Sequence, residues 1–285
     1  MEVPSGKQNK GIVCVYEFFA TSFLVYAVLA SGGNALAASL TVLALIILCD
    51  PISGAHFNPC VTIGVFMASK KLGENLVFFL MILLSQFLGA FLGIFWAWLV
   101  LIPNYIDGKS TLPSAWSTPL CPVGVSENGD IIAPCDPNED RDRGAFFFQF
   151  FSSFIFVFLI MSIKGQNSAP SEDGVLKPLT VALTLLGQIS VSAEQGGACY
   201  NPAVAVAQLT FGIATTDGTL HSSQLHYSWI FIIAPLLGGS LAGLIQRWHD
   251  NVMLKMKSGG ATRVDTYDEL ATNQLNTHSK PASMD

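Results

Sequence analysis

Two short stretches decide the fold, SGAHFNPCVT at residues 53–62 and YNPAV at residues 200–204. Each contains an Asn-Pro pair in an apolar context. Proline suits the first turn of a helix, where its missing N–H would have no partner in any case, and asparagine is a favoured N-cap. The sequence therefore predicts one helix that starts after Asn58 and another that starts after Asn201.

The two apolar segments that follow, at residues 61–72 and 204–213, are too short to cross a membrane, because a spanning helix needs about 20 residues. They are better interpreted as re-entrant half-helices that start inside the bilayer. Irregular backbone at that depth is tolerated where it lines a water-filled cavity. We therefore expect the approaches at 53–57 and 194–200 to line a cavity and to expose carbonyl acceptors there.

The rest of the chain has the composition of a membrane protein. Hydrophobic residues make up 51% of the 285 residues, charged residues make up 12%, and the mean hydropathy is +0.49, whereas a soluble domain carries about 25% charged residues. Six apolar runs are long enough to cross a bilayer as helices. They lie at 11–32, 35–52, 75–102, 145–163, 178–193 and 227–246. The first run is too long for a signal-peptide core, so we expect it to be retained.

Positive charge orients these spans. Of the 14 Lys and Arg residues, eleven lie on the side of both termini and three on the other side. The positive-inside bias places both termini in the cytoplasm, and the plasma membrane is favoured over an internal membrane. The net charge of -6 comes mostly from loops and tails, which is typical of solvated segments, and no basic patch indicates a nucleic-acid partner.

An internal repeat organises the chain. YEFFATSF at 16–23 in the first span matches FQFFSSFI at 148–155 in the fourth, and QFLGA at 86–90 matches PLLGG at 235–239. Because each half has three spans, the second half enters the membrane from the opposite face, as in the inverted repeats that form transport pathways. The half-helices would then meet start to start, with positive dipole ends that oppose cations and asparagine amides that donate to a passing water or polyol.

With these motifs the chain resembles the aquaporin and aquaglyceroporin family over about residues 11–248. The residues that correspond to the family's pore motifs are Asn58, Pro59, Cys60, Asn201, Pro202 and Ala203. The resemblance implies an all-α membrane fold with six transmembrane helices and two re-entrant half-helices in an inverted 3+3 repeat. It also implies a homotetramer with one pore per subunit, which passes water and small neutral solutes through membrane lipid. We expect no cofactor and no metal.

This resemblance divides the chain into three parts. They are a cytoplasmic tail at 1–10, a channel domain at 11–248 and a disordered cytoplasmic tail at 249–285. Within the channel domain the first repeat is 11–102, the outer loop is 103–144 and the second repeat is 145–248.

Three residues are expected to anchor the signature loops. Glu17 matches the family's first-span glutamate, which by analogy accepts backbone N–H groups of a signature loop, and an ionisable group inside a span is usually functional. His56 fits the family's loop histidine, for which packing against loop carbonyls is preferred over proton gating. Gln149 stands where a second glutamate is expected, so the second anchor would be a neutral bond and weaker than a charge-assisted one.

The largest departure from the family is Val204, which stands where the family places the arginine of its outer constriction. The other constriction positions correspond to Ala38, Ala198 and either Gln188 or Ile189. Such a filter would be wider and more apolar than that of a strict water channel, because it lacks the volume, donors and charge of arginine. This favours glycerol or urea beside water, although a wide apolar mouth can also close by dewetting.

The cysteines carry two further expectations. Cys60 replaces the usual alanine of the first motif, and we expect it to keep the helix start and to offer thiol reagents a target. Cys121 and Cys135 lie in the outer loop, where a disulfide between them is a hypothesis, since spacing alone does not fix the geometry that a disulfide requires. The remaining cysteines, in or beside the spans, are interpreted as small buried hydrophobes.

Other function classes fit less well. The five histidines are scattered, and no Ser-His-Asp, metal-ligand or phosphate-loop spacing indicates an enzyme. A coupled transporter would carry ionisable groups at the substrate level, whereas Glu17 is the one ionisable residue that we place inside a span. A non-conducting structural or adhesion protein that kept the fold after losing the arginine stays open as the alternative.

Overall fold

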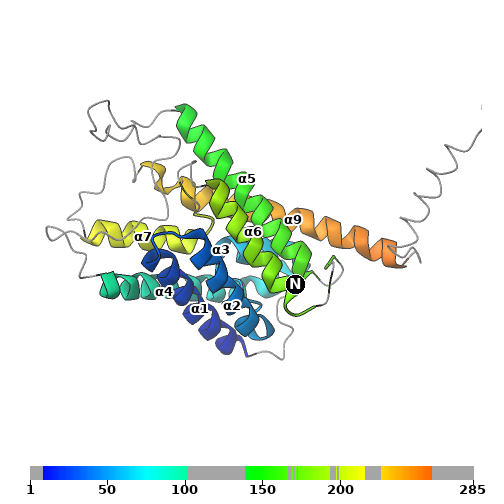
Figure 1. Cartoon of the computed structure of the whole chain (residues 1–285). Coiled ribbons are helices and arrows are strands. Elements are labelled where there is room, and N and C mark those ends of the chain that lie inside the picture. The colour runs from blue at the N-terminus through cyan, green and yellow to red at the C-terminus, as the bar shows by residue number, and fades with distance from the viewer. Residues whose placement is uncertain are drawn as a thin grey trace, which may run out of the picture.

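The computed structural model describes residues 9–101, 139–165, 168–169, 171, 173–192, 197, 199–215 and 226–258. These residues form a bundle of α-helices (Figure 1). The helices of the first half are α1 (Lys10–Ala30), α2 (Ala35–Ser53), α3 (Pro59–Ala68) and α4 (Leu72–Leu101). The helices of the second half are α5 (Glu139–Lys164), α6 (Leu176–Ser192), α7 (Pro202–Thr215) and α9 (Ile230–Ser258). The expected all-α fold is therefore confirmed.

Among the described residues, α1, α2, α4, α5 and α9 are long and apolar enough to cross a membrane. Helix α6 has 17 residues, or about 26 Å of rise, which is the short end of the range for spanning helices. Helices α3 and α7, with 10 and 14 residues, are shorter still. In the described part of the chain, the five long helices, the shorter α6 and the half-length α3 and α7 follow the predicted order.

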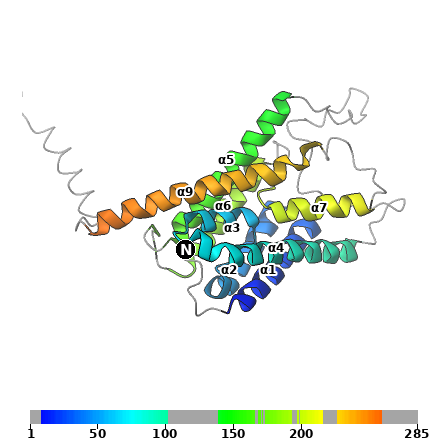
Figure 2. The same cartoon turned by 180° about the vertical axis from the view of Figure 1, so that it is seen from behind.

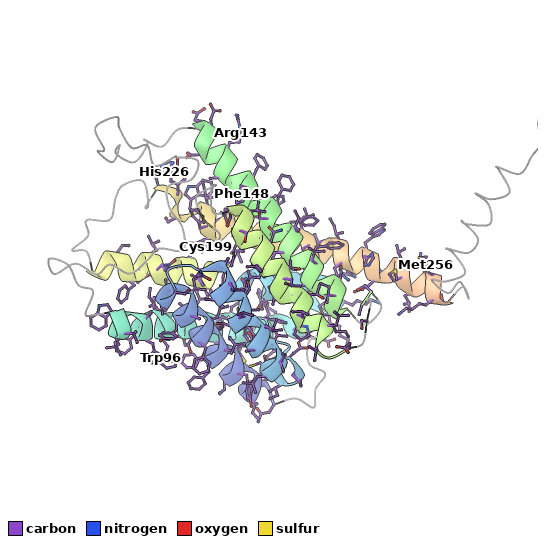
Figure 3. All side chains as sticks on the ribbon, viewed as in Figure 1. Trp96, Arg143, Phe148, Cys199, His226 and Met256 are labelled. Carbon is purple, nitrogen blue, oxygen red and sulfur yellow. The ribbon has the colours of Figure 1, made fainter. Side chains whose placement is uncertain are left out.

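The outward faces of the bundle are apolar. Leu48 is 63% exposed, Val77 68% and Leu84 60%, and Figure 3 shows such side chains standing out from the helices, with Trp96 at the outer edge of α4. A soluble monomer rarely exposes apolar surface on this scale. These faces are suited to contact with lipid or with other membrane helices.

The two halves repeat the same close packing. An added Cβ at Gly89 of α4 would lie 2.2 Å from the carbonyl oxygen of Phe18, and one at Gly238 of α9 would lie 2.4 Å from that of Phe150. Both pairs occupy matching positions of the sequence repeat. Because these two glycines have no side chain, the backbone of α1 can approach α4 closely, and that of α5 can approach α9 closely.

Each half-helix packs against the last helix of the opposite half. Helix α3 contacts α9, and α7 contacts α4, as Figure 2 shows for α7, which runs beside α4. This exchange places the starts of α3 and α7 between the two halves, in the interior of the bundle.

Several helix ends differ from the prediction. Helix α3 ends at Ala68 because Ser69 is extended, with φ -63° and ψ 140°, so the half-helix is shorter than the predicted 61–72. Helix α5 begins at Glu139, before the predicted start, with acidic residues in its first turn that favour a helix N-terminus. Helix α5 therefore extends into the predicted outer loop, where these acidic residues stabilise its N-terminus.

Helix α9 also continues beyond its predicted end. Residues 249–258 are helical, which corrects the assignment of this part of the chain to a disordered tail. The stretch from Arg247 to Ser258 contains no Gly or Pro, and Lys255 and Lys257 in the last turn complement the negative end of the helix dipole. The predicted domain boundary at 248 therefore falls within a continuous helix.

Candidate functional site

The site begins with a loop of unusual backbone geometry. Helix α2 is capped at its C-terminus by Gly54, which has φ 83°, and the next residues include Ala55 at φ 49° and Phe57 at φ 54°. We call residues 54–57 the first loop. Left-handed conformations at residues other than glycine cost about 1–3 kcal/mol each and persist only where the surroundings fix them. The contacts around the first loop must therefore be strong.

Glu17 supplies most of these contacts from α1. Its Oε1 accepts from Ser53 Oγ at 2.8 Å and from the backbone N–H of His56 at 3.0 Å. Its Oε2 accepts from the backbone N–H of Phe57 at 2.7 Å and from Gln86 Nε2 at 2.9 Å. A carboxylate has about four acceptor positions, so all of them are used. The bonds expected of Glu17 to the first signature loop are present, on a side chain with no exposed surface.

His56 packs within the same network. Its Nδ1 lies 3.2 Å from Thr62 Oγ1, and that hydroxyl also bonds Asn58 O at 3.0 Å and Gln86 at 2.8 Å. The ring is half-buried. This contact links the first loop to the first turn of α3.

The two Asn-Pro motifs meet where α3 and α7 begin. Asn58 Nδ2 donates to Tyr200 O at 2.9 Å, and Asn201 Nδ2 donates to Phe57 O at 2.8 Å. Each asparagine also caps its own helix, because its Oδ1 accepts from the N–H two residues on, at 2.8 Å in Cys60 and 3.1 Å in Ala203.

Each of these amides keeps a second N–H, for which the described residues provide no hydrogen-bond partner. The two asparagines retain 6% and 9% of their surface exposed. The crossed bonds therefore hold the two amides close to each other's loop in the interior of the bundle.

The corresponding anchor of the second half is weaker. Gln149, at the position that matches Glu17, donates from Nε2 to Gly197 O at 3.0 Å. Its Oε1 is buried and has no partner among the described residues. Glutamine thus makes one neutral bond where glutamate accepts four.

This geometry can be compared with known proteins. The family model described as Major intrinsic protein matches residues 5–246. The chain belongs to the major intrinsic protein family. Members of this family are channels for water and small solutes rather than enzymes, and the chain is accordingly a multi-pass integral membrane protein.

Relatives of this major intrinsic protein bear both water-channel and glycerol-channel names. It is 29% identical over 247 residues to Aquaporin Z of Brucella melitensis biotype 1, covering 80% of this chain and 93% of that one. It is 25% identical over 202 residues to Aquaglyceroporin-2 of Rhizophagus irregularis, covering 68% of this chain and spanning 58% of that protein's length. The aquaglyceroporin structure from Plasmodium falciparum has the same fold, with a TM-score of 0.63 at 21% identity over 87% of this chain and 98% of that one.

Cys60 occupies a buried position in this major intrinsic protein. It has no exposed surface, and its Sγ donates to the carbonyl oxygen of Pro235 in α9 at 2.9 Å. Burial makes a thiol less reactive, which argues against the expectation that Cys60 offers reagents a target. The replacement of alanine instead adds a bond between α3 and α9.

The predicted constriction residues lie at the ends of three helices. Ala38, in the first turn of α2, is 2% exposed, and Val204, in the first turn of α7, is 5% exposed and packs with Ala203 and Ala205. Gln188 and Ile189 of α6 are both half-buried, so burial does not choose between them. Ala198, Cys121 and Cys135 lie outside the described residues.

One charged pair could not be predicted from the sequence. Lys164, the last residue of α5, forms an ion pair with Asp50 of α2, and its side chain is only 7% exposed. Its Nζ also donates to Gly54 O at 2.8 Å. The one sign in the sequence is that both residues fall at the ends of apolar runs on the same side of the membrane, which does not by itself pair them.

Proposed function

We propose that this major intrinsic protein is a passive channel for water and small neutral solutes such as glycerol or urea. The observation that carries this proposal is the crossed pair of hydrogen bonds between the two Asn-Pro motifs. These bonds hold the Asn58 and Asn201 amides together at the starts of two half-helices. The positive dipole ends there disfavour cations, and the amides offer donors that replace part of a solute's hydration without carrying charge.

The preference for solutes larger than water rests on the residue that follows the second motif. Val204 gives the outer constriction neither charge nor hydrogen-bond donors, and Ala38 is small and apolar. With Ala198 and either Gln188 or Ile189 these residues would form a wide filter. An arginine there would add volume, five N–H donors and a positive charge. We infer that glycerol and urea pass this filter more readily than they would pass a constriction that contains arginine.

The proposed setting is a homotetramer in the plasma membrane with both termini in the cytoplasm. The distribution of Lys and Arg supports this orientation, with eleven of 14 on the side of the termini. The apolar outward faces of the helices are suited to lipid and to neighbouring subunits. Each subunit would carry its own pore, since both Asn-Pro motifs come from one chain.

Solute flux tests the proposal. The purified protein is reconstituted in liposomes, and stopped-flow light scattering follows volume change under gradients of sucrose, glycerol and urea, with empty liposomes as the control. Faster water flux and faster glycerol or urea entry than in empty liposomes are expected. Rates no faster than the control for every solute would overturn the proposal in favour of a non-conducting structural or adhesion protein.

A further inference from the structure

An ion pair joins the two halves of the repeat beside the first loop, with the Lys164 side chain 7% exposed and the Asp50 side chain 37% exposed. Lys164 comes from the end of α5, and Asp50 comes from the last turn of α2. The Lys164 ammonium contacts the Asp50 carboxylate and donates to Gly54 O. Asp50 in turn accepts, through its backbone oxygen, from the Gly54 N–H at 3.1 Å. Both polar backbone groups of Gly54 are therefore bonded to this pair.

Stability alone does not account for such a pair. Removing the Lys164 ammonium from water is costly, and its attraction to the partly exposed Asp50 carboxylate offsets only part of that cost. Lys164 does gain from its place beside the C-terminus of α2, where a cation complements the helix dipole. The bond to Gly54 O is the contact that an apolar side chain would lack.

A carboxylate and an ammonium hold the backbone of the first loop, the carboxylate through its N–H groups and the ammonium through a carbonyl. Glu17 accepts from the N–H groups of His56 and Phe57, whereas Lys164 donates to the carbonyl of Gly54. Gly54, Ala55 and Phe57 all have positive φ, so the loop needs contacts on both sides to keep this shape. The loop shape in turn places Phe57 O, which accepts from Asn201.

The repeat shows what the second half lacks. Residues 16–23 match residues 148–155, which are 132 positions further on, so Lys164 corresponds to residue 164 - 132 = 32, which is Gly32. Glycine has no side chain to donate to the second loop. The first loop therefore has a cationic donor from the opposite half, and the second loop has no counterpart at the matching position.

We propose that Lys164 is a positioning residue for the pore. Its ammonium, contributed by the second half of the repeat, fixes the Gly54 carbonyl and so holds the first loop in the shape that aligns Phe57 O and Asn58 with the second motif. The effect on solute flux rests on the proposed function, whereas the effect on the loop itself does not.

Four variants test this role. Lys164→Met keeps the length of the side chain without charge or donors, and Lys164→Arg keeps both. Asp50→Asn combined with Lys164→Met removes both charges without leaving one unpaired. Lys71→Met is the matched control, since Lys71 forms an ion pair with Glu74 on an exposed surface, with side chains 69% and 70% exposed.

Hydrogen–deuterium exchange of the peptide that contains residues 54–58 measures loop opening directly, and stopped-flow water flux in liposomes measures the pore. Lys164→Met and the double variant are expected to raise exchange by about tenfold or more, which is about 1.4 kcal/mol, and to lower water flux several-fold. Lys164→Arg and Lys71→Met are expected to match the wild type in both measurements.

Wild-type exchange in Lys164→Met would overturn the proposal. Wild-type exchange in the double variant would also overturn it, because Lys164 would then serve only to neutralise Asp50. If Lys164→Met gives no folded protein, the double variant carries the same test. If Lys164→Met raises exchange but the wild type does not conduct, the proposed function is refuted and the role of Lys164 in the loop is supported. If the wild type conducts but Lys164→Met leaves exchange unchanged, the proposed function is supported and the role of Lys164 is refuted.

Discussion

The residues that hold the first loop differ in charge from those at the corresponding positions of the second half. Glu17 accepts four hydrogen bonds at the base of the first loop, whereas among the described residues Gln149 makes one neutral bond and its buried Oε1 has no partner. Lys164 donates to the first loop, whereas its counterpart is Gly32. The first half thus has charged residues where the matching positions of the second half are Gln149 and Gly32, and the crossed asparagine bonds join the two motifs.

Removing the strongest anchor should have the largest effect. Glu17→Leu leaves two backbone N–H groups, a hydroxyl and an amide without their acceptor, and each unsatisfied buried group costs about 1–3 kcal/mol. We expect a loss of stability above about 3 kcal/mol, measured by thermal unfolding in detergent. Glu74→Leu, at an exposed carboxylate, is the control, and an equal shift in Tm for the two variants would contradict the role of Glu17.

A positive charge can be introduced directly after the second Asn-Pro motif by mutation of Val204. Val204→Arg adds volume, donors and a positive charge at the outer constriction. Glycerol flux should fall by about tenfold, which is about 1.4 kcal/mol, and water flux should fall less. Val204→Leu controls for size without charge. A glycerol-to-water flux ratio that is the same before and after Val204→Arg would show that the constriction lies elsewhere.

The weaker anchor should matter less than the stronger one. Gln149→Leu removes a single neutral hydrogen bond to Gly197 O and at the same time removes the unpaired Oε1. The expected loss of stability is about 1 kcal/mol, measured in the same unfolding assay as for Glu17→Leu. A loss as large as that of Glu17→Leu would show that the two halves are anchored equally.

The smallest effect on stability is expected at Cys60, the position at which the first motif has a thiol and the second has alanine. Cys60→Ala makes the first motif match Ala203 of the second and removes the bond to Pro235 O. Stability should fall by about 0.5–1 kcal/mol, since S–H is a weak donor. Because Cys60 is buried, a thiol reagent should leave Cys60 unmodified in the folded protein, as mass mapping can check. Labelling of Cys60 under native conditions would contradict its placement against α9.

Local sequence features predicted much of this arrangement. An Asn-Pro pair in an apolar context fits a capped helix start, and the repeat then places two such starts face to face. Glu17 was expected to be functional because an ionisable group inside an apolar span is costly, and its bonds to the signature loop were expected from the family resemblance.

Features that depend on register between distant helices could not be predicted. The ion pair of Lys164 and Asp50 requires the ends of α5 and α2 to meet at Gly54, and the burial of Cys60 requires its contact with Pro235. The extension of α9 to Ser258 was missed for a different reason, since hydropathy ends at the membrane boundary while helix propensity does not. The filter residue of α6 stays undecided between Gln188 and Ile189, because both are half-buried.

The central claim is that solutes pass the two asparagine amides, and it is tested most directly by removing their donors while keeping the helix caps. Asn58→Asp and Asn201→Asp each keep a cap acceptor, since aspartate is an equally good N-cap, but replace Nδ2 by an oxygen. Stopped-flow water flux per folded protein should fall by about five- to tenfold in each, as about 1–1.4 kcal/mol implies. Wild-type flux in both variants would contradict a pathway past these amides.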